Sequence, residues 1–227
     1  MKKLFVKVYG EHACFTHPAL KTERSTYPVM TPSAAEAVLR SIYWKPQFIY
    51  TIDCIHVLNE IKTEQIMRNE IKNFTFPRSI SEIKEVFINN QKTKTQRLTE
   101  VLINPAYVIE ARQIMLPGFN DQPTRIKHEE IFTRRVEKRQ CFRQPFLGMK
   151  EFMCNFDVYN PETDKAIDSS KKLGVMLHYI LYPDATTACE VITPTFFNAK
   201  LESGILHVPE LPERYEFHRR NYNESPK

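Results

Sequence analysis

The apolar and polar positions of this chain follow a period of two in some blocks and of 3.6 in others. Residues 4–10 (LFVKVYG) alternate and are rich in β-branched and aromatic side chains, which predicts a strand that ends at Gly10. In residues 31–44 the apolar side chains recur at helical spacing, on Ala35, Val38, Leu39 and Ile42. A helix with one core-facing stripe is therefore expected after the first strand.

This predicted helix carries its own start and stop signals. Thr31 or Ser33 is the expected N-cap, and Glu36 lies three residues after Ser33, as in a capping box. Pro46 ends the helix because a proline disfavours helical geometry in the residue before it. The helix exit, residues 41–46 (SIYWKP), thus holds two large aromatic side chains and a lysine.

The next two segments differ sharply in pattern. Residues 47–58 (QFIYTIDCIHVL) predict a second strand, with one face formed by Ile49, Thr51, Asp53, Ile55 and Val57. Residues 60–94 are polar and weakly patterned, so we interpret them as an insertion that holds one short helix at residues 81–90.

A second strand–helix unit follows the insertion. Residues 96–116 predict two strands joined by a turn at Asn104-Pro105, and residues 122–140 predict a helix that ends in a basic run. Strand, helix, strand, followed by strand, helix, strand, is the order of ferredoxin-like and RNA-recognition folds.

After Cys141, short apolar runs separated by Pro, Asp and Asn turns predict an antiparallel β region with a frayed tail. We therefore predict an α+β fold in two parts. Residues 1–145 form an N-terminal ferredoxin-like or RNA-recognition-type domain with the insertion around residues 60–94. Residues 146–227 form a C-terminal antiparallel β-sheet extension.

Charge changes this picture only slightly. The chain has 227 residues, and its 32 Lys and Arg against 27 Asp and Glu give a net charge of +5. A mild basic excess favours polyanionic partners, but an ordinary basic surface explains it equally well.

Cysteine usage and apolar runs bear on the compartment. The five cysteines are scattered without a C-x-x-C pair, which argues for reduced thiols in a cytoplasm and against a zinc site. The first ten residues lack a signal-peptide pattern. The longest uncharged run, residues 173–183, is shorter than the ~20 residues that a membrane span needs. A cytoplasmic protein without a membrane partner is expected.

The sequence lacks the common catalytic signatures G-x-S-x-G, G-x-x-x-x-G-K-[ST] and H-E-x-x-H. Residues 160–165 (NPETDK) loosely resemble the carboxylate pair and lysine of metal nucleases, but their Asn-Pro turn favours a solvated loop. We therefore expect no metal and no other cofactor.

Two pairs of residues allow both a plain and a functional interpretation. Lys127 and His128 lie near the start of a basic helix, where a surface lysine beside a partly buried histidine is the simpler explanation. In the plain interpretation Tyr43 and Trp44 cover the core and Lys45 faces solvent, and in the functional interpretation Tyr43 and Lys45 bind RNA. In the second case the tyrosine ring stacks on an unpaired base and the lysine pairs with phosphate.

Several blocks of sequence together resemble one family. They are YGEHACFTHP, YPVMTPSAAEAVLRSIYWKP, IHVL followed by RNE, KHEEIFTRRVEKRQCFRQPFLGMKEF, and LGVML followed by TPTFFNAKLESGILHVPELP. Over residues 7–209 the chain resembles the type I-C (Dvulg subtype) members of the fifth CRISPR-associated subunit family. Residues 73–94 hold no motif that aligns with this family.

The resemblance implies an endoribonuclease that cleaves the CRISPR repeat in precursor crRNA, without a metal, on the 3′ side of the repeat hairpin. It also implies that the protein stays on the 5′ handle as a subunit of the interference complex. The catalytic tyrosine of the family matches Tyr43, and its adjacent lysine and histidine match Lys127 and His128.

The resemblance also gives the basic residues a role. We expect RNA-phosphate contacts from Arg24, Lys45, Arg68, Arg134, Arg135, Lys138 and Arg139. The alternative is a non-catalytic scaffold that grips the crRNA handle while another protein cuts. Duplex DNA stays open as a further partner because a basic groove discriminates weakly between backbones.

Metal-free RNA cleavage most simply uses the 2′-hydroxyl as the nucleophile and leaves a 2′,3′-cyclic phosphate. In this mechanism His128 is the general base or acid, and Lys127 stabilises the charged phosphorane. Tyr43 positions the 2′-hydroxyl or carries a proton. The division of roles between His128 and Tyr43 stays open.

Overall fold

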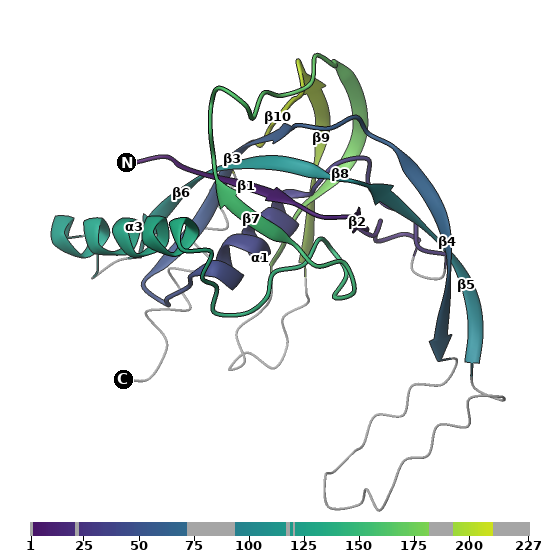
Figure 1. Cartoon of the computed structure of the whole chain (residues 1–227), viewed down its shortest axis with the longest axis horizontal. Helices are drawn as coiled ribbons and strands as arrows, with labels where there is room; N and C mark the ends of the chain where they lie inside the picture. The colour runs from purple at the N-terminus through teal and green to yellow at the C-terminus, as the bar shows by residue number, and fades with distance from the viewer. Residues whose placement is uncertain are drawn as a thin grey trace, which may run out of the picture.

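The computed structural model describes residues 2–20, 23–71, 94–116, 119, 121–181 and 193–210. Within these residues the chain forms a seven-stranded antiparallel sheet, a three-stranded sheet and two helices (Figure 1). The helix predicted at residues 81–90, the predicted tail and Cys189 lie outside the described residues.

Four strands of the large sheet and the two helices form a ferredoxin-like unit. In chain order they are β1 (Leu4–Tyr9), α1 (Pro32–Ile42), β3 (Phe48–Val57), β6 (Ala106–Met115), α3 (Gln122–Glu137) and β7 (Asn155–Val158). Their strands lie in the order β7-β1-β6-β3, and every neighbouring pair is antiparallel. The predicted ferredoxin-like class is thus confirmed.

Three C-terminal strands extend the same sheet beyond β3. They are β10 (Ile205–His207), β9 (Thr193–Glu202) and β8 (Lys171–Leu181), in that spatial order. The predicted C-terminal β-sheet extension is therefore confirmed. The division between residues 145 and 146 stays a prediction; β7, the fourth ferredoxin-like strand, lies on its C-terminal side.

The smaller sheet contains β2 (His12–Ala13), β5 (Lys94–Ile103) and β4 (Thr63–Ile71), with β5 in the middle. In Figure 1, β4 and β5 curve away from the main body. The interpretation of residues 60–94 as an unpatterned insertion missed β4, which pairs with β5 over its whole length. Most β4 side chains are exposed or half-buried, so the strand lacks the apolar alternation that a core-facing strand shows.

A β-bulge in β3 corrects the predicted strand faces. The register with β6 shifts between Ile52 and Cys54, so Asp53 is the extra residue. Past the bulge, Ile55 and Val57 join Ile52 in the core instead of facing away from it. The prediction failed here because strict alternation assumes that no residue is inserted in the ladder.

Helix α1 begins at Thr31, one of the two residues predicted as its N-cap. The Thr31 hydroxyl accepts a hydrogen bond from the Ala34 amide (3.3 Å), which makes Thr31 the N-cap and places Ser33 inside the helix. The stripe of Val38, Leu39 and Ile42 is fully buried against the sheet.

Among the described residues, no helix is long and apolar enough to cross a membrane. The four described cysteines are free thiols.

Candidate active site

Tyr43 is positioned by the end of helix α1. Its amide donates to the Leu39 carbonyl oxygen (3.0 Å), and its own backbone is extended, with φ −152° and ψ 128°. This change of direction at the C-cap turns the ring inward, where only 3% of the residue is exposed. The ring packs on Phe48, at the start of β3, with centroids 5.8 Å apart.

His128 reaches the same place from helix α3. The helix begins at an Asp121 N-cap, whose carboxylate accepts a hydrogen bond from the Thr124 amide (3.0 Å). His128 follows two turns later, is 4% exposed, and packs on Phe48 with ring centroids 5.2 Å apart. Phe48 thus packs against both rings and supports them.

The structure brings Tyr43 and His128 together. The tyrosine hydroxyl lies 2.7 Å from Nδ1 of His128, a hydrogen bond between residues 85 positions apart. Among the described residues, Nε2 of the same ring has no hydrogen-bond partner. A histidine with one nitrogen held and the other available has the geometry of an oriented acid–base group.

The Tyr43 backbone is itself held by buried groups. The Tyr50 hydroxyl donates to the Tyr43 carbonyl oxygen (2.7 Å), and the Gln113 amide donates to the Tyr50 hydroxyl (3.3 Å). Neither Tyr50 nor Gln113 was expected from the sequence. No signal in the sequence singled out either residue, because β6 carries Glu110 and Arg112 as well as Gln113.

Arg135 supports the pair from the far end of α3. Its guanidinium donates to the Ile42 carbonyl oxygen (2.7 Å), which satisfies one of the open carbonyls at the end of α1. The same guanidinium lies 5.1 Å from the centroid of the Tyr43 ring, a cation–π arrangement. The RNA-phosphate contact predicted for Arg135 stays a prediction.

Burial and charge set the protonation states of the pair. Burial, with the neighbouring charges of Lys127 and Lys45, lowers the pKa of His128 below its usual value. Burial raises the pKa of the Tyr43 hydroxyl, and the Arg135 cation only partly opposes this. At neutral pH the imidazole is therefore neutral and the phenol is protonated.

These protonation states allow two forms of the hydrogen bond. If Tyr43 donates to Nδ1, then Nε2 carries the ring proton and is a donor. If Nδ1–H donates to the tyrosine oxygen, then Nε2 has a free lone pair and is a base. Moving the ring proton from Nε2 to Nδ1 therefore converts Nε2 from a hydrogen-bond donor to a base.

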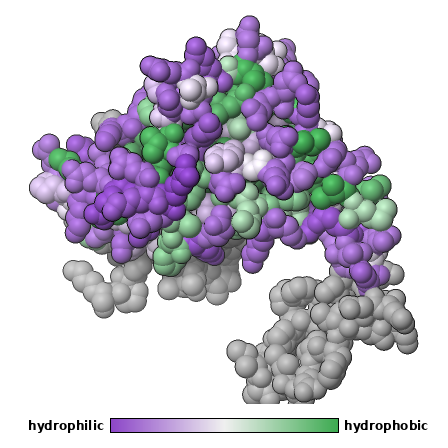
Figure 2. Space-filling model, in the orientation of Figure 1, coloured by the Kyte–Doolittle hydropathy of each residue, from purple (hydrophilic) through white to green (hydrophobic). Residues whose placement is uncertain are grey.

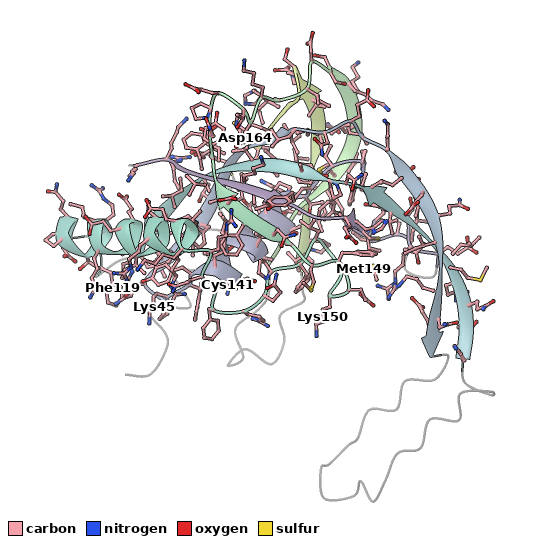
Figure 3. All side chains as sticks on the ribbon, in the orientation of Figure 1. Lys45, Phe119, Cys141, Met149, Lys150 and Asp164 are labelled. Carbon is pink, nitrogen blue, oxygen red and sulfur yellow. The ribbon has the colours of Figure 1, made fainter. Side chains whose placement is uncertain are left out.

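The other predicted residues divide into exposed cations and paired cations. Lys127 and Lys45 are exposed beside His128, and Figure 3 shows Lys45 on the lower side of the ribbon, below α3. Arg134 and Lys138 are exposed on the last turns of α3, a part of the surface that is strongly hydrophilic in Figure 2. Arg139 is exposed but pairs with Asp157 on β7 at 2.5 Å.

Arg24 and Arg68 lie in a separate cluster at the small sheet. Arg24 approaches Glu70 at 3.2 Å, and Arg68 pairs with Glu151 and approaches Glu70 at 3.9 Å. Both guanidinium groups therefore have carboxylate partners within the protein, and their contact with RNA stays a prediction.

No group of three or more His, Cys, Asp or Glu side chains suited to a metal ion occurs in the described part of the chain. Asp164, from the segment that loosely resembled a metal nuclease, is buried and pairs with Lys7 at 2.5 Å. This carboxylate therefore neutralises a lysine of β1, which is a structural role.

A ferredoxin-like sheet with a tyrosine, a histidine and several exposed cations near one helix is typical of RNA-binding folds. The family profile described as CRISPR-associated protein (Cas_Cas5) matches residues 4–209. The chain belongs to this family, in its Cas5d branch.

Two curated relatives have the name CRISPR pre-crRNA endoribonuclease Cas5d. The protein of Mannheimia succiniciproducens is 34% identical in an alignment of 219 residues that covers 91% of this chain and 95% of that protein. The protein of Thermus thermophilus is 34% identical in an alignment of 231 residues, gaps included, that covers 95% of this chain and 94% of that protein.

Solved structures agree on the fold. A crystal structure of a CRISPR-associated protein superposes with a TM-score of 0.67 at 24% identity and covers 93% of this chain and 94% of its own. A functionally uncharacterised protein from Streptococcus mutans gives a TM-score of 0.64 at 22% identity, with 92% and 93% covered.

Proposed function

We propose that this protein is a metal-independent endoribonuclease that cleaves CRISPR repeat RNA within precursor crRNA. The observation that carries the proposal is the buried hydrogen bond between Tyr43 and His128 (2.7 Å), set among the cations Lys45, Lys127 and Arg135. Membership of the family, with two relatives named as pre-crRNA endoribonucleases, supports the substrate.

The arrangement can perform each step of cleavage by the 2′-hydroxyl. Nε2 of His128 accepts the 2′-hydroxyl proton, and the 2′-oxygen then bonds to the adjacent phosphorus. Lys127 and Lys45 offset the negative charge of the phosphorane. The bond between phosphorus and the 5′-oxygen breaks, the 5′-oxygen takes a proton from water, and a 2′,3′-cyclic phosphate remains. The His128 imidazolium then returns its proton to the hydroxide that is left.

In this mechanism Tyr43 acts on His128 rather than on the RNA. Its hydroxyl oxygen accepts a hydrogen bond from Nδ1–H, which orients the ring and stabilises the imidazolium that forms when Nε2 takes the proton. The raised pKa of Tyr43 makes its phenolate scarce at neutral pH, so the base is the imidazole.

A non-catalytic handle-binding scaffold is the alternative. A scaffold needs exposed cations, which Lys45, Lys127 and Arg134 supply, but it has no use for an oriented histidine that is 4% exposed. We further propose that the protein works in the cytoplasm and stays on the 5′ handle of the product as a subunit of the type I-C complex.

The test is a single-turnover assay with purified protein, labelled repeat RNA and EDTA. The expected result is a handle-length product with a 2′,3′-cyclic phosphate, which phosphatase leaves intact until acid opens the ring. His128→Ala should cut roughly 10²–10⁴ times more slowly while binding RNA with similar affinity. A strict need for Mg²⁺, or normal cutting by His128→Ala, would contradict the mechanism.

Two further outcomes of the same assay address the alternatives. Tight binding of repeat RNA without any product would favour the scaffold. A duplex DNA competitor that displaces the RNA at equal concentration would assign the basic surface to duplexes as well.

A further inference from the structure

Trp44 is an exposed aromatic residue directly beside the candidate active site. It follows Tyr43 in sequence, but where Tyr43 is buried, Trp44 keeps 46% of its surface exposed. The guanidinium of Arg40, one turn back on α1, lies 5.4 Å from the centroid of the indole ring. The sequence had suggested a structural role for this residue, and its exposure argues against one.

Phe142 is a second exposed aromatic residue at the same helix end. Its amide donates to the carbonyl oxygens of Ser41 (2.9 Å) and Ile42 (3.3 Å), and the Arg143 amide donates to Ser41 as well (3.1 Å). These bonds satisfy carbonyls that α1 leaves open at its end. The backbone is therefore anchored, while the Phe142 side chain is 78% exposed.

The two rings share one neighbourhood. Trp44 is the residue after Tyr43, and Phe142 is hydrogen-bonded to the residue before it. Figure 3 shows Lys45 and Cys141, the chain neighbours of Trp44 and Phe142, on the same lower side of the ribbon. Two rings on ordered backbone thus lie next to the Tyr43–His128 pair.

The charges around these rings identify the occupant. Arg40, Lys45 and Arg143 are exposed in the same segments as the rings, and the acidic neighbour Glu36 is buried and lies 4.0 Å from Arg40. Exposed aromatic rings among cations suit unpaired nucleotides, since each base offers a flat face and each phosphate a negative charge. An apolar protein partner would find this surface lined with the exposed cations Lys45 and Arg143.

We propose that Trp44 and Phe142 stack on unpaired bases next to the scissile phosphodiester, while Arg40 and Arg143 pair with the flanking phosphates. The proposal rests on the proposed function, which sets the position of the scissile phosphodiester. It adds a base-binding subsite that holds single-stranded RNA in place over His128.

The sequence supplies a direct probe, because Trp44 is the one tryptophan of the chain. Titration of the His128→Ala protein with repeat RNA should quench tryptophan emission, with a midpoint equal to that of RNA binding measured by anisotropy. RNA binding without quenching would overturn the assignment of Trp44.

Variants test each ring. Trp44→Leu and Phe142→Leu should each weaken RNA binding roughly 5- to 100-fold, the range that loss of one base–aromatic stack gives. Trp44→Phe retains a flat face and should keep most of the affinity. The matched control is Phe196→Leu on β9, which removes an equally exposed ring (46%) and should bind as the unaltered chain does.

The outcomes separate this proposal from the proposed function. If RNA quenches the tryptophan emission and the leucine variants bind RNA more weakly, but the chain never cuts RNA, the subsite is supported and the nuclease is contradicted. If both leucine variants cut RNA and bind it with unchanged affinity, the nuclease is supported and the subsite is contradicted. Unchanged RNA affinity with loss of binding to another protein of the complex would assign this surface to that protein instead.

Discussion

The Tyr43 side chain carries out its proposed role through a single contact. The hydroxyl holds Nδ1 of His128 at 2.7 Å, and at 3% exposure the residue has too little open surface to stack on a base. The sequence left two roles open, positioner of the 2′-hydroxyl or proton carrier. The geometry supports a third, in which Tyr43 orients the histidine that moves the proton.

Tyr43→Phe tests this role, because it removes one oxygen and keeps the packing against Phe48. We expect single-turnover cleavage to slow about five- to tenfold, the factor that about 1–1.5 kcal/mol of hydrogen-bond free energy gives. RNA affinity should be unchanged, since the hydroxyl is buried. A variant that loses affinity but keeps its rate would place Tyr43 on the RNA instead.

The lowered pKa of His128 gives a prediction for pH. If the neutral imidazole is the base, the cleavage rate falls as pH drops through the pKa of His128, which lies below the ordinary 6.5. Lys45→Met removes a cation that disfavours the imidazolium, so the pKa rises and the acid limb moves to higher pH.

A pH–rate profile under single-turnover conditions checks this shift. Arg134→Met is the matched control: it removes an exposed cation from α3 that is not among the causes of the His128 shift. Its acid limb should stay where it is in the unaltered chain. An acid limb that Lys45→Met leaves in place would show that another group titrates.

At the scale of elements, the site depends on how the end of α1 is closed. Two elements supply the missing partners of its carbonyls: the Arg135 side chain from α3, and the Phe142 and Arg143 amides from the segment that follows α3. Helix α3 and the segment that follows it thus together cap α1, and α3 also holds the Tyr43 side chain.

That segment is anchored to the N-terminal strands by Gly148. Its φ of +82° favours glycine, and a Cβ there would lie 2.0 Å from the Cys14 carbonyl oxygen. Gly174 on β8 has nearly the same φ, +81°, but a Cβ there would meet no atom within 4 Å. The two glycines share the left-handed backbone conformation and differ in the space available for a side chain.

Alanine at each position separates the two effects. Gly174→Ala should lower the free energy of unfolding by about 1–2 kcal/mol, the cost of left-handed backbone for an L-residue. Gly148→Ala adds a steric clash with backbone and should lower it by about 2–5 kcal/mol. Urea unfolding followed by circular dichroism measures both, and equal losses would contradict the close approach to Cys14.

At the scale of the whole molecule, cations that the sequence grouped together fall into two regions. Lys45 follows the end of α1, Lys127 lies near the start of α3, and Arg134 and Lys138 lie near its other end; all four are exposed. Arg24 and Arg68 are half-buried at the small sheet, where Glu70 and Glu151 neutralise them. Only the first region offers free positive charge to a phosphate backbone.

The salt dependence of RNA binding distinguishes the two regions. For single-stranded RNA the logarithm of the binding constant falls with the logarithm of salt concentration by about 0.7 per phosphate contact. Lys45→Ala should reduce this slope by about 0.7, whereas Arg68→Ala should leave it nearly unchanged. A reduced slope for Arg68→Ala would support the RNA contact that the sequence predicts for it.

The sequence alone determined the features that depend on neighbours along the chain. Apolar spacing fixed α1 and its buried stripe, proline and glycine marked the element ends, and the order of elements predicted the ferredoxin-like strand order. These features were predictable because helix and strand periodicity bury one side of an element wherever it packs. The motif resemblance named Tyr43, Lys127 and His128 but not their geometry.

Only the tertiary structure decided the contacts between distant segments. The bulge at Asp53 reverses the faces of half a strand, β4 finds its partner in β5, and Arg135 reaches the Ile42 carbonyl across 93 positions. The Tyr43–His128 hydrogen bond joins residues 85 positions apart. No local pattern encodes such pairings, because they arise from how the helices pack on the sheet and from which buried polar groups then need partners.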